Sequence, residues 1–503
     1  MDSLMWRARL ARVALLTLCA AGVMSRPAAA QTYTVTDLGT LGGTRSGSLD
    51  INAAGQVTGV ARTADDAQHA FLYGNGVMTD LGTLGGDGSY GVALNAAGQV
   101  TGYVWTASDP GVQQHAFLFS GGVMTDLGTL GGRESAGYDI NAAGQVTGAA
   151  FTAGNALHAF LYSSGVMADL GTLGGSYSKG VAINTAGQVT GLSFTAGDTE
   201  QHAFLYRDGV MTDLGTLGGV YSQGIAINNA GQVTGEAYTA DNAHRNAFLY
   251  SDGVMRDLGT LGGTVATPFA INDAGQVTGH SYTAGNAEYH AFLYSDGVMR
   301  DLGTLGGKYS QALAINAAGH ITGMAYMADN EEYHAFLYRD GVLIDLNTLI
   351  PSGSGWVLHI GRAINDNGQI TGNGVINGEA HAFLLTPVSA PQAQVQPPID
   401  ADGSSVFNAK RGVIPVKFTL TVNGTPTCQL PPATIAITRL SGDAIDAVDE
   451  SVHLAAADEG QSFRIADCQY LYNLAASSLG PGHFRVDIAI DGTLVGHAEF
   501  SLK

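Results

Sequence analysis

The sequence has no apolar run long enough to span a membrane. Its one extended apolar stretch, Val13 to Met24, follows three arginines and falls short of the roughly 20 residues that a transmembrane helix needs. The segment Arg26-Pro27-Ala28-Ala29-Ala30 comes next. This order is typical of a secretory signal peptide, so we expect residues 1–30 to be removed after Ala30. The mature protein should be soluble, without a membrane span.

Cysteine is scarce, with 3 in the whole chain. Cys19 lies inside the apolar stretch, and the large Leu18 before it departs from the small residue that a lipoprotein signal expects, which makes lipid anchoring the minor alternative. Once the signal peptide is gone, only Cys428 and Cys468 remain, in a chain bound for an oxidising compartment. One disulfide between them is the simplest prediction.

Basic residues are also few. Lys and Arg number 22 against 43 Asp and Glu, which gives a formal net charge of −21. Such a surface repels nucleic acid and anionic lipid, so we expect neither as a partner. Charged residues make up 13% of the chain and hydrophobic residues 45%, which is ample for real cores and does not indicate disorder.

Helical periodicity is absent, and an internal repeat takes its place from about residue 31 to 387. Three phrases recur in fixed order: Asp-Leu-Gly-Thr-Leu-Gly-Gly, Ile-Asn-x-Ala-Gly-Gln-Val-Thr-Gly and His-Ala-Phe-Leu-Tyr. The first phrase starts at eight positions spaced by 43 to 46 residues, and its last copy is degenerate. These starting positions are Asp37, Asp80, Asp126, Asp169, Asp213, Asp257, Asp301 and Asp345.

Each repeat predicts four short strands, because β-branched and aromatic residues alternate with small ones and Gly or Asn punctuates every run. In Ala270–Val277 the Asn-x-x-Gly forms a tight turn, where the Asn side chain bonds the turn backbone and Gly takes a positive φ. A second hairpin follows with Asp296-Gly297 at its turn.

Four antiparallel strands at this period favour a β-propeller, with a solenoid as the competing architecture. The ends of the array decide between them. The last unit stops after His381–Leu385 without its fourth strand, whereas Tyr33–Leu38 has that strand's pattern and no strands before it. Pairing the two completes a ring, so we predict an all-β, eight-bladed β-propeller over residues 31–386, closed by an N-terminal strand.

The repeats resemble the HAF-repeat family of extracellular proteins, named for the His-Ala-Phe at His69-Ala70-Phe71 and its later copies. The resemblance covers about seven tenths of the chain and implies secretion far more firmly than any activity. One copy departs from the pattern, because Asn246 stands in place of His.

A Pro- and Gln-rich stretch, residues 387–399, is interpreted as an extended linker. Residues 400–503 then predict a small immunoglobulin-like β-sandwich, with strands expected at Val413–Val422, Ala433–Leu440, His483–Asp491 and Leu494–Leu502. Ile414-Pro415-Val416-Lys417-Phe418 resembles the PxKF domain of secreted bacterial proteins, which implies no chemistry. Lys417 itself should point to solvent.

No catalytic, metal-binding or cofactor-binding motif appears in the chain. Gly-x-Ser-x-Gly, His-Glu-x-x-His, P-loop and EF-hand signatures are missing, so we predict no cofactor and no metal. The repeated histidines sit on different blades, about 10 Å apart, too far to share a metal. We expect them to satisfy backbone groups of their own blade. They are His69, His115, His158, His202, His290, His334 and His381.

Two sets of loops vary between the repeats, and variable loops on a repeated frame are where recognition usually resides. The first set follows each Gly-Gly, near one mouth of the channel, and supplies the candidate ligand-binding residues Arg45, Glu134, Tyr177, Tyr221 and Tyr309. The second set contains Asp65-Asp66, Asp109-Pro110 and Glu331-Glu332 and is expected at the opposite or outer edge. Plain solvent exposure is the alternative for both sets.

A recurrent aromatic residue in each unit is interpreted as packing between blades. Its copies are Trp105, Phe151, Phe194, Tyr238, Tyr282 and Tyr326.

These features favour a secreted, non-catalytic binding protein at the cell surface or outside the cell, with the periplasm as an alternative location. Its ligand would be an extracellular glycan or peptide, and its oligomeric state is open. Two rivals remain. One is a glycan hydrolase or lyase using Glu134, Asp139 and the channel-mouth tyrosines, which requires two carboxyl groups within about 5–9.5 Å. The other is a purely structural surface protein.

Overall fold

The fold is all-β. The computed structural model describes residues 32–108, 111–388, 392–400, 403–408, 413–422, 425–428, 432–441, 458, 461–490 and 493–503. The predicted signal peptide and Asp109-Pro110 lie outside these residues. The chain divides into two compact parts, the repeat region up to residue 388 and the C-terminal region from residue 392. Within the described residues, no helix has the length and apolarity to cross a membrane.

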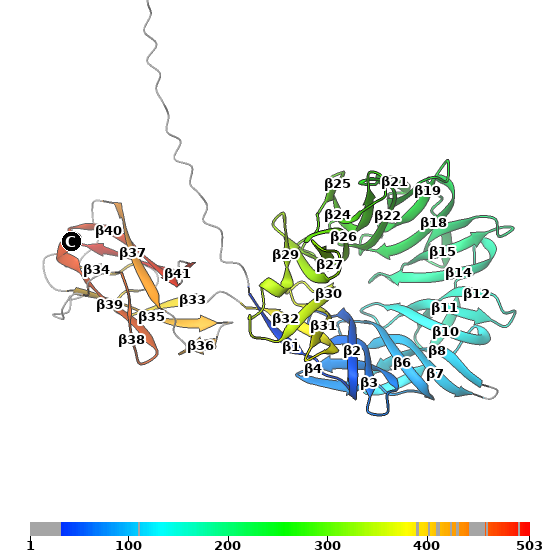
Figure 1. Ribbon diagram of the computed structural model, residues 1–503, viewed down its shortest axis with the longest axis horizontal. Helices are drawn as coiled ribbons and strands as arrows, with labels where there is room; N and C mark the ends of the chain where they lie inside the picture. The colour runs from blue at the N-terminus through cyan, green and yellow to red at the C-terminus, as the bar shows by residue number, and fades with distance from the viewer. Residues whose placement is uncertain are drawn as a thin grey trace, which may run out of the picture. The chain divides into compact units, whose positions relative to one another are not determined.

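The repeat region consists of units of four strands each (Figure 1). The first strands of units 1 to 8 are β2 (Gly42–Ile51), β6 (Gly85–Leu94), β10 (Gly131–Ile140), β14 (Gly174–Ile183), β18 (Gly218–Ile227), β22 (Gly262–Ile271), β26 (Gly306–Ile315) and β30 (Trp356–Ile364). The second strands are β3 (Val57–Thr63), β7 (Val100–Ser108), β11 (Val146–Thr152), β15 (Val189–Thr195), β19 (Val233–Thr239), β23 (Val277–Thr283), β27 (Ile321–Met327) and β31 (Ile370–Ile376).

The remaining two strands of each unit carry the His-Ala-Phe phrase and the start of the Asp-Leu-Gly phrase. The third strands are β4 (Gln68–Gly74), β8 (Gly111–Ser120), β12 (Leu157–Ser163), β16 (Gln201–Arg207), β20 (Arg245–Ser251), β24 (Tyr289–Ser295), β28 (Tyr333–Arg339) and β32 (Glu379–Pro387). The fourth strands are β5 (Val77–Asp80), β9 (Val123–Asp126), β13 (Val166–Asp169), β17 (Val210–Asp213), β21 (Val254–Gly259), β25 (Val298–Asp301), β29 (Val342–Asp345) and, in unit 8, β1 (Tyr33–Asp37).

Both predicted hairpin turns are confirmed. In unit 6 the side-chain oxygen of Asn272 accepts hydrogen bonds from the backbone N–H groups of Ala274 and Gln276, at 3.1 and 3.0 Å, and Gly275 has a φ of 76°. Asp296 and Gly297 both have positive φ, 55° and 81°, which is the backbone of a type I′ hairpin turn. The Asn-x-x-Gly and Asp-Gly turns of each repeat therefore join its strands in antiparallel order.

The cores of the repeat region lie between consecutive units. The phenylalanine of each His-Ala-Phe phrase is fully buried, as is Phe248 after the exceptional Asn246. Phe204 of unit 4, for example, packs with Ile183 and Val189 of its own unit and with Ala159 of unit 3. Burying one such side chain contributes about 1.5–3 kcal/mol. No unit can bury this face alone, so the units stabilise one another.

The first and last units are joined, as the sequence predicts. β1 pairs antiparallel with β32, so that Asp37 lies opposite Phe383. In unit 3, Asp169 on β13 lies opposite Phe160 in the same way. In Figure 1 the blue β1 lies beside β32. The N-terminal strand thus fills the place of the missing fourth strand in unit 8.

A set of buried asparagines links every unit to the next. Each Asn of the Ile-Asn phrase donates its side-chain amide to the backbone carbonyl of the equivalent Asn in the following unit, over 2.9–3.1 Å. The order is Asn52, Asn95, Asn141, Asn184, Asn228, Asn272, Asn316, Asn365 and back to Asn52. Buried amides must be satisfied, and here each one joins two neighbouring units.

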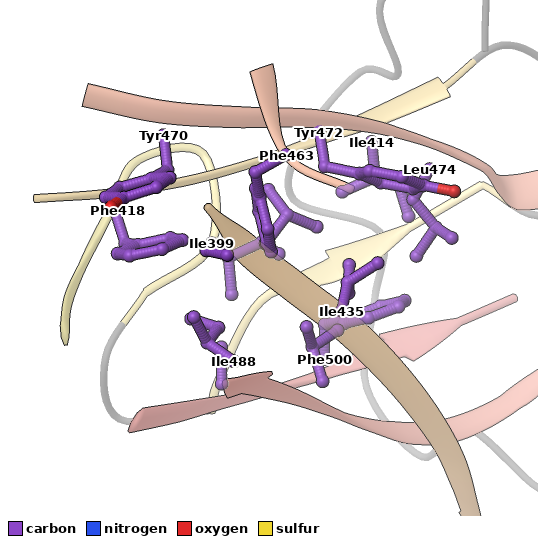
Figure 2. Packing of buried hydrophobic residues seen from close by; sticks show 14 of the residues in the cluster. Ile399, Ile414, Phe418, Ile435, Phe463, Tyr470, Tyr472, Leu474, Ile488 and Phe500 are labelled. Carbon is purple, nitrogen blue, oxygen red and sulfur yellow. The ribbon is translucent and has the colours of Figure 1, made fainter. Parts of the chain in front are cut away.

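The C-terminal region contains two sheets with one hydrophobic core (Figure 2). One sheet has the order β33 (Gln392–Gln396), β35 (Val413–Val422), β39 (Gln469–Ala475), β38 (Arg464–Ala466), with β36 (Thr425–Thr427) paired to β35. The other has the order β34 (Val406–Phe407), β41 (Thr493–Leu502), β40 (Gly482–Ile490), β37 (Ala433–Ser441). Phe418 and Tyr470 stack in the core with ring centroids 4.3 Å apart. A single turn of 3-10 helix, η2 (Ala476–Ser478), follows β39.

Two features of this region differ from or extend the sequence-based predictions. The four predicted strands are present, but the stretch interpreted as a linker contributes β33, which pairs with β35 from Gln392↔Thr421 to Gln396↔Lys417. Its alternating Gln, Ala and Val residues suit a sheet edge better than a free linker. The predicted disulfide between Cys428 and Cys468 is present, with the two Cα atoms 4.8 Å apart. Lys417 is half-buried.

Candidate functional site

The repeated histidines pair with aspartates, not with the backbone groups that we predicted. In seven units the histidine Nδ1 lies 2.7–3.0 Å from the carboxylate that begins the Asp-Leu-Gly phrase of the same unit. The prediction failed because the aspartate lies opposite the Phe two residues after the histidine, so the two side chains meet diagonally across neighbouring strands. In unit 5, Asn246 donates its amide to both oxygens of Asp257, at 3.0 Å.

Each of these pairs is complete within its own unit. The aspartate also accepts a hydrogen bond from the backbone N–H two residues ahead, as Asp80 does from Gly82 at 2.7 Å. Within the part of the chain that the structure describes, no three His, Cys, Asp or Glu side chains gather in a way that could hold a metal ion. The histidines therefore do not form a shared site.

The five candidate ligand residues are not brought together. Arg45, Glu134, Tyr177, Tyr221 and Tyr309 occupy the beginning of the first strand in units 1, 3, 4, 5 and 7. Arg45 and Glu134 are exposed, whereas the three tyrosines are half-buried.

The tyrosines pack against rings on the second strand of their own unit. Tyr177 lies against Phe194, with ring centroids 5.7 Å apart, and Tyr309 against Tyr326 at 5.5 Å. Tyr221 and Tyr238 form the same contact at 5.5 Å. The recurrent second-strand aromatics thus pack within units here, rather than between blades as we expected.

The two variable loop sets lie at the same end of the repeat region, not at opposite or outer edges. The backbone N–H of Ser176, after a Gly-Gly, donates to the carboxylate of Asp198, in the loop before a His-Ala-Phe phrase, at 2.7 Å. Lys308 and Asn330 make the equivalent bond in unit 7, also at 2.7 Å. We missed this because the second strand returns the chain to the end at which the first strand began. We call this end the variable end.

A pocket of about 800 Å³ opens at the variable end between units 1 and 2, and we call it the Trp105 pocket. Trp105 forms one wall, and its ring packs edge-on against Tyr90 and Tyr103 with centroids 5.7 Å apart. The Tyr90 hydroxyl donates to the side-chain oxygen of Gln68, which also lines the pocket. The other charged and polar lining residues are Arg62, Asp65, Asp66, His69 and Asp87.

Unit 2 has a glycine, Gly88, at the position where units 4, 5 and 7 carry a tyrosine, and this leaves room for the Trp105 pocket. Gly88 pairs with Gln68 across the unit boundary, in the same register as Tyr177 with Leu157 and Tyr309 with Tyr289. A Cβ at Gly88 would lie 3.4 Å from the Trp105 ring. The first-strand tyrosines fill this space between units, and the glycine leaves it open.

A second pocket, of about 650 Å³, lies between units 7 and 8, and we call it the Trp356 pocket. Its lining includes Glu331, Glu332, Tyr333, Trp356 and His359. Trp356 is 8% exposed and packs edge-on against Phe383, with ring centroids 6.0 Å apart. Its indole is therefore fixed in place by the core of unit 8.

The degenerate Asp-Leu-Gly phrase, which begins at Asp345 at the end of unit 7, shapes the Trp356 pocket. Leu346–Thr348 forms a turn of 3-10 helix, η1, and the carboxylate of Asp345 accepts a hydrogen bond from the backbone N–H of Asn347. The side chain of Asn347 then bonds the backbone N–H and C=O of Leu358, at 2.8 and 3.0 Å. This fixes the start of β30 near Trp356. Asp345 also holds His334 Nδ1 at 2.7 Å.

His359 contributes an uncharged ring to the Trp356 pocket. Burial lowers the pKa of His359, the neighbouring His334 lowers it further, and Glu332 opposes the shift. A histidine pKa below its usual value near 6.5 means a neutral imidazole at neutral pH. The ring lies 5.5 Å from that of Tyr333, so the two present a continuous aromatic surface.

The two pockets have the same construction. Each lies between consecutive units and takes two adjacent carboxylates from the loop between the second and third strands of the preceding unit, Asp65-Asp66 or Glu331-Glu332. Each takes one tryptophan from the following unit. The sequence has 3 tryptophans, and both that lie in the described residues are used in this way. Tryptophan scarcity was the sequence signal that could have located the pockets.

Glu134 and Asp139, the two carboxyl groups named in the catalytic alternative, are not brought together. Glu134 and Asp139 lie near opposite ends of β10, and five residues of strand correspond to roughly 16 Å. Asp139 instead accepts the backbone N–H groups of Ile140 and of Ile183 in the next unit, each at 2.8 Å. Burial raises the pKa of Asp139 to about 7 and that of the equivalent Asp50 to about 6.

Comparison with known proteins adds no family. No family model matches the chain, and no curated protein does. Among solved structures it is similar to TolB from Acinetobacter baumannii, with 12% identity and a TM-score of 0.33 over 50% of this chain and 64% of that chain. It is also similar to dipeptidyl peptidase 4 from Porphyromonas gingivalis, with 8% identity and a TM-score of 0.38 over 72% of this chain and 60% of that chain.

A third similar structure is the SapL1 lectin in complex with alpha methyl fucoside, with 11% identity and a TM-score of 0.24, over 61% of this chain and 97% of that one. The chain spans less than two thirds of the length of the first two structures. At these levels of likeness, none of the three assigns a function.

Proposed function

We propose that this protein is a secreted, non-catalytic binding protein that takes an extracellular glycan or peptide into the Trp105 and Trp356 pockets. The observation that carries the proposal is that both described tryptophans line pockets of the same construction. Pockets of about 300–1,000 Å³ with aromatic walls and a few fixed polar groups are typical of small-molecule sites. The ligand site thus lies on the variable end, though not at the residues first expected.

We propose that the repeat region is an eight-bladed β-propeller of the HAF-repeat kind. Two observations support closure: the pairing of β1 with β32, and the circle of asparagine hydrogen bonds that returns from Asn365 to Asn52. A closed ring holds the relative positions of its loops, which suits preformed pockets between units.

The C-terminal region is proposed to be an immunoglobulin-like, PxKF-type accessory module. Its two sheets share one core, and the disulfide joins Cys428 to Cys468, as an oxidising compartment allows. We place the protein outside the cell or at the cell surface, with the periplasm as the alternative.

The test is an array of glycans and peptides probed with the mature full-length chain. We expect at least one ligand class to bind, and the double variant Trp105→Ala with Trp356→Ala to lose that signal. Because Trp356 is buried in the core of unit 8, its truncation should also lower the unfolding temperature, so circular dichroism must show that the double variant is still folded at the assay temperature. Each tryptophan sits at a unit boundary, so Trp→Phe variants serve as a milder pair. Failure of the wild-type chain to bind any array member would favour the purely structural alternative.

A further inference from the structure

We infer that the two tryptophan pockets recognise protonated amino sugars, that is, pyranose units with a free ammonium group. This inference rests on the proposed function and names the class of ligand. Its basis is the combination, in both pockets, of a tryptophan wall with carboxylates that exceed the cationic groups beside them.

Two carboxylates line the Trp356 pocket, and no lysine or arginine is among its lining residues. Glu331 and Glu332 are exposed on the loop between β27 and β28, and no ion pair to either is found within the described ranges. The neighbouring His359 is neutral at neutral pH, because burial lowers its pKa. A pocket of this charge attracts cations and repels carboxylate or sulfate groups.

The Trp105 pocket reaches the same balance with different residues. Three carboxylates line it, and the one guanidinium, Arg62, lies 3.5 Å from Asp66. The hydroxyl of Thr63 donates to Asp65 and holds the pKa of that carboxyl below its usual range. Asp65 therefore stays ionised, and within the described residues no ion pair joins Asp65 or Asp87 to a lysine or arginine. The Trp105 and Trp356 pockets are built from different residues, but each has one tryptophan and two carboxylates without an ion-pair partner in the part of the chain that the structure describes.

The tryptophan rings of the two pockets also suit an amino sugar. A cation within about 6 Å of an indole face is attracted to its ring, by about 0.5–2 kcal/mol. The apolar face of a pyranose covers an aromatic ring while its hydroxyl groups reach the polar rim. Gln68 in one pocket and Asn347 in the other supply neutral polar groups at the rim.

A sugar suits these pockets better than a lysine or arginine side chain. Cavities of about 800 and 650 Å³ lie within the range for small-molecule ligands, and a slender alkyl chain would leave most of that space to water. Two equivalent pockets on one rigid frame also favour a polymer, because a second contact along the same chain binds at high effective concentration.

The experiment compares three probes against the mature full-length chain by calorimetry, in low salt and at a mildly acidic pH. The probes are a tetramer of glucosamine, the N-acetylated tetramer of the same length, and tetralysine. We expect the glucosamine tetramer to bind at least tenfold more tightly than the other two. Its affinity should fall when salt is raised, because the carboxylates are solvent-exposed.

Variants separate the pocket from general surface charge. Glu331→Gln with Glu332→Gln should weaken the glucosamine tetramer at the Trp356 pocket about tenfold. Glu288→Gln is the matched control, because Glu288 lies in the equivalent loop of unit 6, which forms no part of either pocket. It should leave binding unchanged. Thermal unfolding of each variant checks that its fold is retained.

Three results would overturn the amino-sugar assignment while leaving the proposed function in place. The N-acetylated tetramer could bind as tightly as the charged one, tetralysine could bind more tightly than either, or all three could fail while other array ligands bind through the tryptophans. Failure of every array ligand as well would remove the proposed function itself.

Discussion

Asn365 donates its side-chain amide to the backbone carbonyl of Asn52, 2.9 Å away and 313 residues earlier in the chain. The same bond joins every consecutive pair of units, so this one is the link that returns the series to its start. Its partner in closure is β1, which supplies the fourth strand of unit 8. The two ends of the repeat region are therefore held by interactions that a linear array would not have.

Removing the N-terminal strand should destabilise the repeat region. Deletion of residues 31–38 removes the buried Tyr33, whose loss alone is worth about 3–5 kcal/mol, and leaves His381 without Asp37. We expect a lower unfolding temperature for the full-length chain in a thermal melt. The control is Thr34→Ala, because Thr34 is exposed and makes only a marginal bond to Thr386. Unchanged stability after the deletion would contradict closure.

The histidine–aspartate pairs should tolerate an amide and resist an apolar residue. Asn246 already makes two hydrogen bonds to Asp257, so His158→Asn should keep the contact to Asp169 and change the free energy of unfolding little. His158→Leu leaves the carboxylate without its side-chain partner, although the backbone N–H of Gly171 still donates to it, and should cost about 1 kcal/mol more. Urea unfolding of both variants measures the difference. Equal costs would show that the imidazole matters only as packing volume.

The stability of the repeat region should fall between about pH 4 and pH 7. Burial raises the pKa of Asp139 from its usual 3.8 to about 7. The folded state then keeps a proton that the unfolded chain releases, so the free energy of unfolding decreases as pH rises through this window, by at most a few kcal/mol. Asp139→Asn should flatten this slope, whereas Asp208→Asn at an exposed turn should not. Unfolding curves at pH 4, 5.5 and 7 provide the test.

Filling the Trp105 pocket should abolish binding there and nowhere else. Gly88→Tyr introduces the residue that units 4, 5 and 7 carry in the same register. Its Cβ would lie 2.7 Å from the backbone oxygen of Gln68, so the local backbone must shift to accept it, and thermal unfolding of the variant checks that the fold is kept. The new ring would occupy the space in front of Trp105, because even a Cβ lies 3.4 Å from the indole. Only the Trp356 pocket of this variant should still bind ligand. If both pockets still bind, the Trp105 cavity is not a ligand site.

Much of the fold could be predicted from the sequence, because each repeat contains residues typical of tight turns. Asn272, Gly275 and Asp296-Gly297 define the hairpins, and the unmatched strand at Tyr33 defines the closure. The strands β33, β34, β36, β38 and β39 were missed. β39 follows a tight turn at Asp467-Cys468, which has positive φ but lacks the Gly typical of such turns.

The site could not be predicted in the same way. A pocket opens where a unit has a small residue at a strand position that carries a large side chain in other units, and the strand pairing is needed to recognise such a position. The search for function went to tyrosines such as Tyr177, which are conspicuous in sequence and fill space in the structure. Gly88 leaves space, and only the pairing with Gln68 shows that it stands where a tyrosine would. The carboxylates of the second loop set were correctly singled out as variable, but their return to the same end required the strand order.

The measurement that tests the central claim most directly is the binding stoichiometry of the full-length chain, by calorimetry with the tightest array ligand in its shortest form. Two equivalent pockets predict two ligands per chain, one per chain in Trp105→Ala and in Trp356→Ala, and none in the double variant. A double variant that binds with unchanged stoichiometry and affinity would contradict the assignment of function to these pockets.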